Sequence, residues 1–227
     1  MTSDEIRIFP LGDSALTVKF GNVISEELNR KAIALADAVT RQPFPGFIEA
    51  VPAYASTTVF YDLVDAGRGS ETPSTVFSYV SDQMKSLLAH LDYNVTQPSR
   101  NIEIPTHFNA ADALDLERIE QVSGLDAERV IDIFTSRTYR VYMLGFLPGF
   151  SYMGEVDERI AVGRKETPRT SVPKGSVGIA GRQTGIYSLD SPGGWQIIGR
   201  TDVEMFSPEG EQPTYLRPGD QVKFVRV

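Results

Sequence analysis

The sequence contains no cysteine and only two histidines, His90 and His107, among its 227 residues. Without cysteine the chain can form no disulfide and offers neither a thiolate nucleophile nor a thiolate ligand for a metal. The histidines have no partner residues at the spacing of a known ligand set, so we expect no metal site. His90 ends a predicted helix, and His107 is expected to be a half-exposed residue beside a strand.

Long apolar runs and basic clusters are absent as well. No run approaches the roughly 20 apolar residues that a membrane-spanning helix needs. Residues 1–5 are acidic and lack the basic and apolar regions of a signal peptide. The net charge is −8, from 22 basic and 30 acidic residues, and no basic cluster is available for nucleic acid. We therefore expect a cytoplasmic protein that binds neither membranes nor nucleic acid.

Two common catalytic motifs are missing too. The phosphate-binding pattern G-x-x-x-x-G-K-[ST] does not occur, and the glycine-rich residues 175–181 are not followed by a predicted helix whose N-terminus would bind phosphate. No G-x-S-x-G nucleophile elbow occurs, and few residues could act as the base of a Ser-His-Asp triad. We therefore expect no ATP binding by this chain alone.

The first hundred residues alternate between strand and helix patterns. Strand patterns cover residues 7–10, 15–20, 47–51, 56–61 and 102–105. A Ser25 N-cap followed by apolar residues at helical spacing predicts one helix, and a second is predicted to start near Thr72-Pro73. Residues 62–74 otherwise have the pattern of a loop. This order favours a small sandwich with helices on one face of a sheet.

The remaining residues predict two short helices and then a series of strands. Asp112 and Asp126 are the predicted N-caps of the helices, and the first helix is predicted to stop at Gly124. Short strands are predicted at 139–144, 176–179, 185–189, 195–201 and 221–227. Many short strands at close spacing are typical of a barrel or sandwich. Residues 95–100, which include Gln-Pro-Ser, are the predicted domain boundary.

Between residues 145 and 201, glycine and proline lie beside side chains that hydrogen-bond or stack on ligands. Glycine has no Cβ, so its backbone amides can closely approach a bound group. Arg169 and Arg200 could hold a carboxylate by two parallel hydrogen bonds, with Trp195 as a wall. The same residues could equally make turns, core and surface ion pairs. Residue types alone leave both interpretations open.

Four long motifs carry a family resemblance. They are G-F-x-P-G-F-x-Y-x-G from Gly145, P-R-x-x-V-P-x-G-S-V-G-I-A-G-x-Q-T-G-I-Y from Pro168, S-P-G-G-W-x-x-I-G-R-T from Ser191, and residues 216–224. Residues 10–16 and 51–56 match as well, so the likeness runs nearly end to end. The sequence resembles the family of 5-oxoprolinase B subunits, also called allophanate hydrolase subunit 1, which includes the KipI sporulation-kinase inhibitor.

The resemblance implies an α+β fold, with a small α/β N-terminal domain over residues 1–95 and a cyclophilin-like β-barrel domain over residues 96–227. It also implies a role as one subunit of an ATP-dependent 5-oxoprolinase. Such a protein would work with homologous C and separate A subunits to open 5-oxo-L-proline, a small cyclic amide, to L-glutamate. ATP would be used at the level of the complex, and this chain would be inactive alone.

The resemblance also implies where the substrate binds, although it singles out no catalytic residue and no metal ligand. The implied substrate-binding residues are Arg169, Ser176, Gln183, Thr184, Tyr187, Trp195 and Arg200. The implied loop and motif residues are Gly145, Phe146, Pro148, Gly149, Phe150, Tyr152, Gly178, Gly181, Gly193 and Gly194. Gln183, Thr184 and backbone amides near residues 178–181 could stabilise a developing oxyanion.

The sequence departs from the family pattern at two places. Members usually read P-V-x-Y-G-G-x-x-G-P-D-L where this chain has residues 105–116, so Phe108 stands in place of a tyrosine. They usually carry a histidine where this chain has Phe134, and no residue replaces it unless His107 does. The loss of a general acid or base typically lowers a rate by about two to four powers of ten.

These departures keep other functions open. One is a KipI-type regulatory protein that binds and inhibits a sensor histidine kinase. Another is a subunit of a related allophanate hydrolase or urea amidolyase. A prolyl isomerase, suggested only by the barrel, has the weakest support, because a fold does not imply a function.

Overall fold

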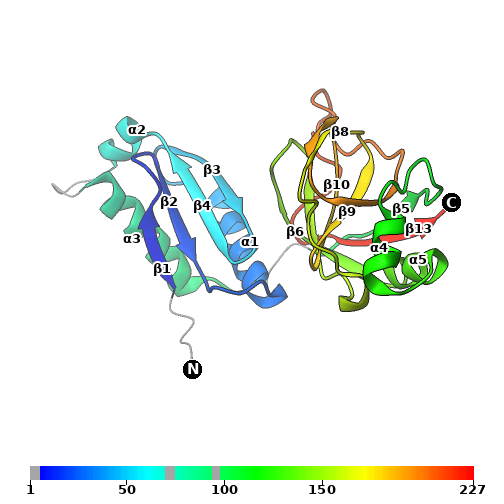
Figure 1. Cartoon of the computed structure of the whole chain (residues 1–227). Helices are drawn as coiled ribbons and strands as arrows, with labels where there is room; N and C mark the ends of the chain where they lie inside the picture. The colour runs from blue at the N-terminus through cyan, green and yellow to red at the C-terminus, as the bar shows by residue number, and fades with distance from the viewer. Residues whose placement is uncertain (1–5, 70–74, 94–97) are drawn as a thin grey trace. The chain divides into compact units, whose positions relative to one another are not determined.

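The computed structural model describes residues 6–69, 75–93 and 98–227, which divide into two compact units, Met1–Pro98 and Ser99–Val227 (Figure 1). The predicted domain boundary between residues 95 and 96 lies outside the described residues. Within the described ranges, no helix has the length and apolar character needed to cross a membrane.

The first unit is built on a four-stranded antiparallel sheet with the order β1-β2-β4-β3. Its strands are β1 (Arg7–Pro10), β2 (Ala15–Lys19), β3 (Phe47–Pro52) and β4 (Ser56–Tyr61). All four were predicted from the sequence. Side chains on alternate residues, including Leu16, Val18, Val59 and Tyr61, are buried on one face of this sheet.

Helices α1 (Glu26–Arg41) and α3 (Val76–His90) cover that buried face. The Ser25 hydroxyl caps α1 by accepting a hydrogen bond from the Leu28 amide, as predicted. The apolar residues of both helices face the sheet and join a single core with it. The predicted arrangement of helices on one sheet face is therefore confirmed.

The predicted loop at residues 62–74 is wrong for its first half. Helix α2 (Leu63–Arg68) forms there because the Asp62 carboxylate accepts hydrogen bonds from the amides of Val64 and Asp65. Such an N-cap satisfies donors that a short helix otherwise leaves free. The predicted helix start at Thr72-Pro73 lies outside the described residues, and α3 is capped by Thr75.

The second unit contains a seven-stranded sheet with the order β12-β9-β10-β7-β6-β13-β5, curved into a barrel (Figure 1). Its strands are β5 (Asn101–Thr106), β6 (Thr138–Leu144), β7 (Ser151–Gly154), β9 (Ser176–Ala180), β10 (Gln183–Ile186), β12 (Gln196–Arg200) and β13 (Gln221–Arg226). A separate two-stranded ribbon pairs β8 (Arg169–Val172) with β11 (Ser191–Gly193). The predicted α+β class, a small α/β part followed by a barrel-like part, is confirmed.

One isolated bridge joins the two ends of the sheet. The His107 amide, just after β5, donates to the Arg200 carbonyl at 2.7 Å, and the Arg200 amide donates back to the His107 carbonyl at 2.9 Å. A Cβ on Gly199 would lie 2.7 Å from the His107 carbonyl oxygen, so only glycine allows this approach. We call this contact between β5 and β12 the barrel seam.

Two helices follow β5, and a short 3-10 helix (Glu158–Ile160) follows β7. Helix α5 (Ala127–Thr135) has the predicted cap, because Asp126 accepts a hydrogen bond from the Arg129 amide. Helix α4 (Leu116–Ser123) ends at Gly124 as predicted, but the predicted cap Asp112 is wrong, since Asp115 holds the N-cap position. The Asp115 carboxylate makes no capping hydrogen bond and instead accepts a hydrogen bond from the Ile197 amide of β12.

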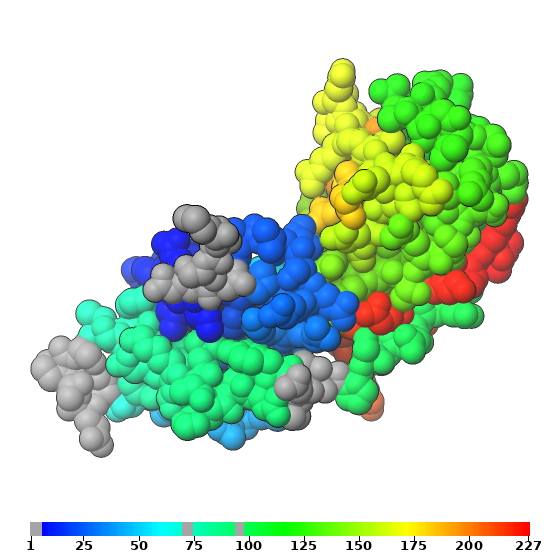
Figure 2. Space-filling model, turned by 90° about the horizontal axis from the view of Figure 1, so that it is seen from below, coloured from blue at the N-terminus to red at the C-terminus, as the bar shows by residue number. Residues whose placement is uncertain are grey.

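The last strand completes the barrel beside the first strand of the unit. Strand β13 pairs in parallel with β5 over six residues and antiparallel with β6. Figure 2 shows the C-terminal residues, in red, against green residues of the same unit. The Arg226 guanidinium binds the Glu128 carboxylate of α5. The core of the unit lies between α4, α5 and the inner face of the barrel.

Candidate functional site

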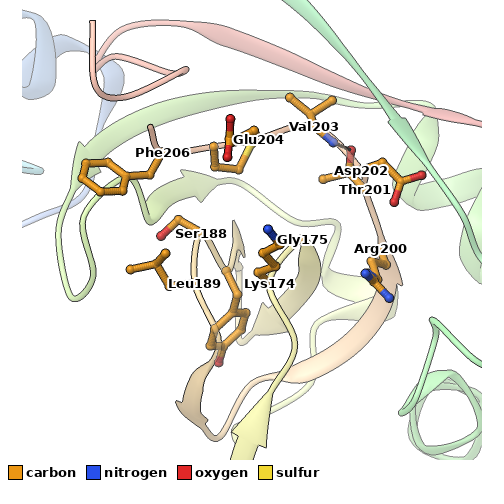
Figure 3. A pocket seen from close by; sticks show the side chains of 12 residues that line it. Lys174, Gly175, Ser188, Leu189, Arg200, Thr201, Asp202, Val203, Glu204 and Phe206 are labelled. Atoms are coloured by element: carbon orange, nitrogen blue, oxygen red, sulfur yellow. Dashed lines mark hydrogen bonds between the residues drawn. The ribbon is translucent and has the colours of Figure 1, made fainter. Parts of the chain in front are cut away.

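A cavity of about 120 Å³ opens at one end of the barrel (Figure 3). Three segments surround it: the turn before β9, the residues after β10 and the residues after β12. The lining residues are Lys174, Gly175, Tyr187, Ser188, Leu189, Arg200, Thr201, Asp202, Val203, Glu204, Met205 and Phe206. Of the residues implied to bind substrate, Tyr187 and Arg200 line it.

Gly175 holds the three segments together. Its amide donates to the Tyr187 carbonyl at 2.7 Å, and its own carbonyl accepts from the Thr201 amide at 2.9 Å. Its φ of +83° lies in the left-handed region, and an added Cβ would lie only 2.1 Å from the Thr201 carbonyl oxygen. Glycine is required here by both backbone conformation and space.

The predicted loop motif supports the cavity wall from behind. The Ser188 hydroxyl donates to the Pro148 carbonyl at 2.6 Å. Gly149, with a φ of +78°, packs so closely on the Met205 backbone that a Cβ would lie 2.8 Å from its carbonyl oxygen. The turn at residues 145–150 therefore fixes two of the lining segments, although Phe146 itself is exposed to solvent.

Arg200 has unused hydrogen-bonding capacity beside the cavity. Its Nε atom is buried and has no hydrogen-bond partner among the described residues. One terminal nitrogen lies 3.8 Å from an Asp112 oxygen, which is a loose ion pair, and the guanidinium is partly exposed. An anionic group that reached the exposed terminal nitrogens of this guanidinium would be bound favourably.

Arg169, the other cation predicted to hold a carboxylate, is already bound within the protein. Both of its terminal nitrogens donate to the buried Asp115 carboxylate, at 2.7 and 2.8 Å. Lys165 and the Ile197 amide donate to the same carboxylate at 2.9 and 2.7 Å. Burial by itself would raise the pKa of Asp115, but the hydrogen bonds from Arg169, Ile197 and Lys165 outweigh it and leave the pKa lowered.

Asp115 was missed as a functional candidate by the sequence reasoning. Its carboxylate links α4, the loop before β8 and strand β12. The available signal was its position in the 105–116 segment, where the aspartate and leucine of the family pattern are retained as Asp115 and Leu116.

The predicted aromatic residues gather in a second cluster, apart from the main barrel core. Phe150 lies at its centre, 5.2 Å from Tyr187, 5.4 Å from Trp195 and 4.8 Å from Tyr152, measured between ring centroids. Tyr187 and Trp195 are buried, and burial raises the pKa of the Tyr187 hydroxyl. Trp195 therefore packs within a cluster, and the Arg164 guanidinium lies over its ring at 6.0 Å.

The glycines of the predicted motifs make room for these rings. A Cβ on Gly178 would lie 3.0 Å from the Trp195 Cβ, one on Gly185 would lie 2.9 Å from Phe150, and one on Gly193 would lie 2.3 Å from the Tyr187 hydroxyl. Gly181 has a positive φ at the β9–β10 turn, and Gly194 accepts a hydrogen bond from the Lys165 amide.

The polar residues of β9 and β10 also have bonds within the protein. The buried Thr184 hydroxyl donates to the Gly178 carbonyl at 2.9 Å, and Ser176 is buried in β9. Strand β9 pairs with β10 on one side and β12 on the other, so its amides belong to the sheet. Gln183 is partly exposed at the start of β10. A substrate role for these residues stays a prediction.

A family profile, the carboxyltransferase domain, subdomain C and D, matches residues 6–216 of this chain. The 5-oxoprolinase B subunit of Bacillus subtilis is 46% identical over 224 residues, a match that covers 97% of this chain and 92% of that protein. The chain belongs to the family of 5-oxoprolinase B subunits.

Solved structures of relatives share the fold of this family member. The crystal structure of TTHA0988 matches with a TM-score of 0.80 and 38% identity, over 98% of this chain. The chain spans only 40% of the TTHA0988 chain. The urea carboxylase of Kluyveromyces lactis matches with a TM-score of 0.74 at 20% identity, over 98% of this chain and 22% of that chain, which shows the fold alone.

The two departures from the pattern of the 5-oxoprolinase B subunits lie in the core, away from the cavity lining. Phe134 is fully buried in α5 and packs against Phe108, Tyr139 and Phe224. His107 does not take the place of the family histidine at Phe134. Phe134 is fully buried, whereas the His107 side chain is partly exposed. The imidazole instead lies 3.2 Å from an Asp202 oxygen.

Proposed function

We propose that this chain is the B subunit of an ATP-dependent 5-oxoprolinase, which converts 5-oxo-L-proline to L-glutamate together with the C and A subunits. The observation that carries the proposal is the 46% identity, along nearly the whole of both chains, to a protein named as a 5-oxoprolinase B subunit. ATP is consumed at the level of the complex, and the chain is inactive alone. The whole activity therefore belongs to the assembly.

The cavity supports a small anionic amide as the substrate. Its volume of about 120 Å³ is of the order of cavities that hold a single small ring. 5-Oxo-L-proline carries one carboxylate and one lactam group. The carboxylate matches the Arg200 guanidinium, which is partly exposed and makes only a loose ion pair with Asp112. Lys174 adds a second cation to the lining, which also includes the carboxylates of Asp202 and Glu204.

The test is ATP-dependent glutamate release from 5-oxo-L-proline by this chain assembled with its cognate A and C subunits. We expect turnover that disappears when this chain is omitted. Arg200→Gln should raise KM by about tenfold or more, because a hydrogen bond to a charged group contributes roughly 1.5–3 kcal/mol. Arg182→Gln is the matched control, since Arg182 binds Glu155 and Glu158 on the surface. Absence of turnover by an assembled complex would contradict the proposal.

One observation favours a second function, the inhibition of a sensor histidine kinase. Phe108 and Phe134 lack the hydroxyl and the imidazole that the family pattern carries at these positions. A chain that had lost catalysis could keep a binding role. An assembled but inactive complex, together with saturable binding of this chain to a histidine kinase, would support that function over the first.

A further inference from the structure

Phe146 is an exposed aromatic residue in an unusual backbone conformation. Its φ is +63°, and among the residues that the structure describes it is the one residue other than glycine with a positive φ. The residue is 62% exposed to solvent. A bulky side chain is disfavoured at this φ, because its Cβ crowds the neighbouring backbone. The fold therefore keeps an aromatic ring in solvent at the expense of backbone strain, a combination found at functional sites.

The ring of Phe146 lies at the edge of the aromatic cluster described above. It meets the buried Phe150 ring edge to face, with the ring centroids 5.6 Å apart. Tyr152 is partly exposed and packs against both Phe150 and Trp195, with centroids 4.8 and 5.8 Å apart. The buried rings therefore hold Phe146 and Tyr152 in place as rigid groups that still reach solvent.

Arg164 adds a cation beside these rings. The residue is exposed, and its guanidinium lies over the Trp195 ring, 6.0 Å from the centroid. Burial raises the pKa of the Tyr152 hydroxyl, and the charge of Arg164 opposes that rise, so the two side chains lie near each other. Within the described ranges, no carboxylate forms an ion pair with Arg164. We call Phe146, Tyr152 and Arg164 the aromatic–arginine surface.

The charges next to Arg164 leave this surface positive. Lys165 and Arg169 share the buried Asp115 carboxylate, and Glu166, in the same loop, is exposed. These five side chains carry three positive and two negative charges, on a chain whose net charge is −8. The surface therefore favours a partner with an acidic group that can reach Arg164.

The composition of the surface is that of a protein interface. Aromatic residues and arginine contribute most of the binding energy at such interfaces. TTHA0988 holds this fold within a longer chain, of which the matched part is 40%, so the rest of that protein is attached to the fold covalently. A separate chain such as this one needs a surface that holds its partner instead.

We propose that the aromatic–arginine surface is the place where the cognate C subunit docks, through a segment that carries apolar and acidic side chains; this inference rests on the proposed function. The apolar side chains of that segment cover the rings of Phe146 and Tyr152 and exclude water from them. A carboxylate of the segment pairs with the Arg164 guanidinium while the guanidinium stays stacked on Trp195. The exposed ring of Phe146 thus contributes to binding and not to folding.

The experiment measures binding of the cognate C subunit to this chain by titration calorimetry at several salt concentrations. Phe146→Gly removes the ring and also the unfavourable φ. It should raise Kd by about tenfold or more without lowering the midpoint of urea unfolding. Arg164→Gln should raise Kd and make binding less sensitive to salt, because an ion pair is lost. Arg164→Glu should weaken binding further, since it places a carboxylate against the acidic segment.

Helix α4 supplies the matched control. Val122 is 51% exposed there, and Arg118 is an exposed cation four positions before it. Arg118→Gln and Val122→Ala should leave Kd and its salt dependence unchanged.

The outcomes separate this inference from the proposed function. Binding of the C subunit with the same Kd for the unsubstituted chain, Phe146→Gly and Arg164→Gln would overturn this inference alone. Turnover by the three subunits without binding of the C subunit to this chain would also overturn it alone. If this chain neither bound the C subunit nor supported turnover, the proposed function and this inference would both be overturned.

Discussion

Phe108 and Phe134 pack edge to face in the second unit, with ring centroids 6.4 Å apart and ring planes at 72°. These are the two positions at which the family pattern has a tyrosine and a histidine. A tyrosine hydroxyl and an imidazole placed there would be neighbours, so the two departures form one coupled change from a polar pair to an apolar pair. In this chain an aromatic contact stands where a tyrosine hydroxyl and an imidazole could form a hydrogen bond inside the core.

The coupling predicts non-additive effects on stability. Phe134→His alone should lower the free energy of unfolding by about 2 kcal/mol, because it buries polar nitrogens among apolar rings. Phe108→Tyr in the same chain supplies a partner, so the double variant should be more stable than the sum of the single variants predicts. Urea unfolding of both single variants and the double variant measures this interaction.

The same double variant tests whether the departures matter for catalysis. We expect it to raise any amide-hydrolysing activity of the complex. Additive stability changes would show that the two side chains do not meet, and unchanged turnover would show that both positions are only structural.

Removal of the Asp115 charge should destabilise the second unit. Asp115→Asn leaves Arg169 and Lys165 without their shared anion, and the loss of one partner from a buried ion pair typically costs about 3–5 kcal/mol. The cations are partly exposed here, so we expect about 2–3 kcal/mol in urea unfolding. Asp112→Asn, at a loose and more exposed ion pair, is the matched control and should cost less than about 1 kcal/mol.

The pH dependence of this difference has a definite sign. Because the folded state lowers the pKa of Asp115, its ionised form stabilises the fold at neutral pH, and that contribution is lost as the pH falls through the lowered pKa. The stability of the unsubstituted chain should therefore fall faster than that of Asp115→Asn as the pH drops below about 4. Parallel curves would contradict this origin of the stability.

Two glycines with positive φ allow backbone strain to be separated from lack of space. Gly175→Ala should cost about 2–3 kcal/mol or more, because it combines an unfavourable φ with a Cβ against the Thr201 carbonyl. Gly181→Ala has a similar φ of +61° but open space around the new Cβ, so it should cost about 1 kcal/mol. Equal losses of unfolding free energy in the two variants would show that the crowding at Gly175 is relieved at no cost.

Local sequence patterns predicted most of the helices and strands, because the interactions that form them join residues close in sequence. The Ser25 and Asp126 caps and the apolar spacing of α1 each depend on residues only a few positions from the next. The strands β7, β8 and β11 were missed because, at three or four residues, they are too short to show an alternating pattern. Helix α2 was missed because its length gives no periodicity, although Asp62 is a good cap.

The candidate site was less predictable because its contacts are between distant residues. Asp115 meets Arg169 across 54 positions, so the sequence could not show that this guanidinium is already bound. The predicted strand at 185–189 lies earlier, at Gln183–Ile186, and the residues after it line the cavity. Among the motif glycines predicted to lie beside a ligand, Gly178 and Gly193 lie against the side chains of Trp195 and Tyr187, and their role toward a ligand stays a prediction.

The order of the barrel strands determines when each strand can pair during translation. Strand β5 is the first strand of the unit to be synthesised, yet its parallel partner β13 begins 120 positions later (221 − 101), with Asn101 opposite Gln221. Its other neighbour, reached through the seam, is β12. Strand β5 therefore stays without its parallel partner until nearly the whole unit has been synthesised. Until residue 226 has been translated, its unpaired backbone can associate with other strands, so the nascent chain is prone to misfolding.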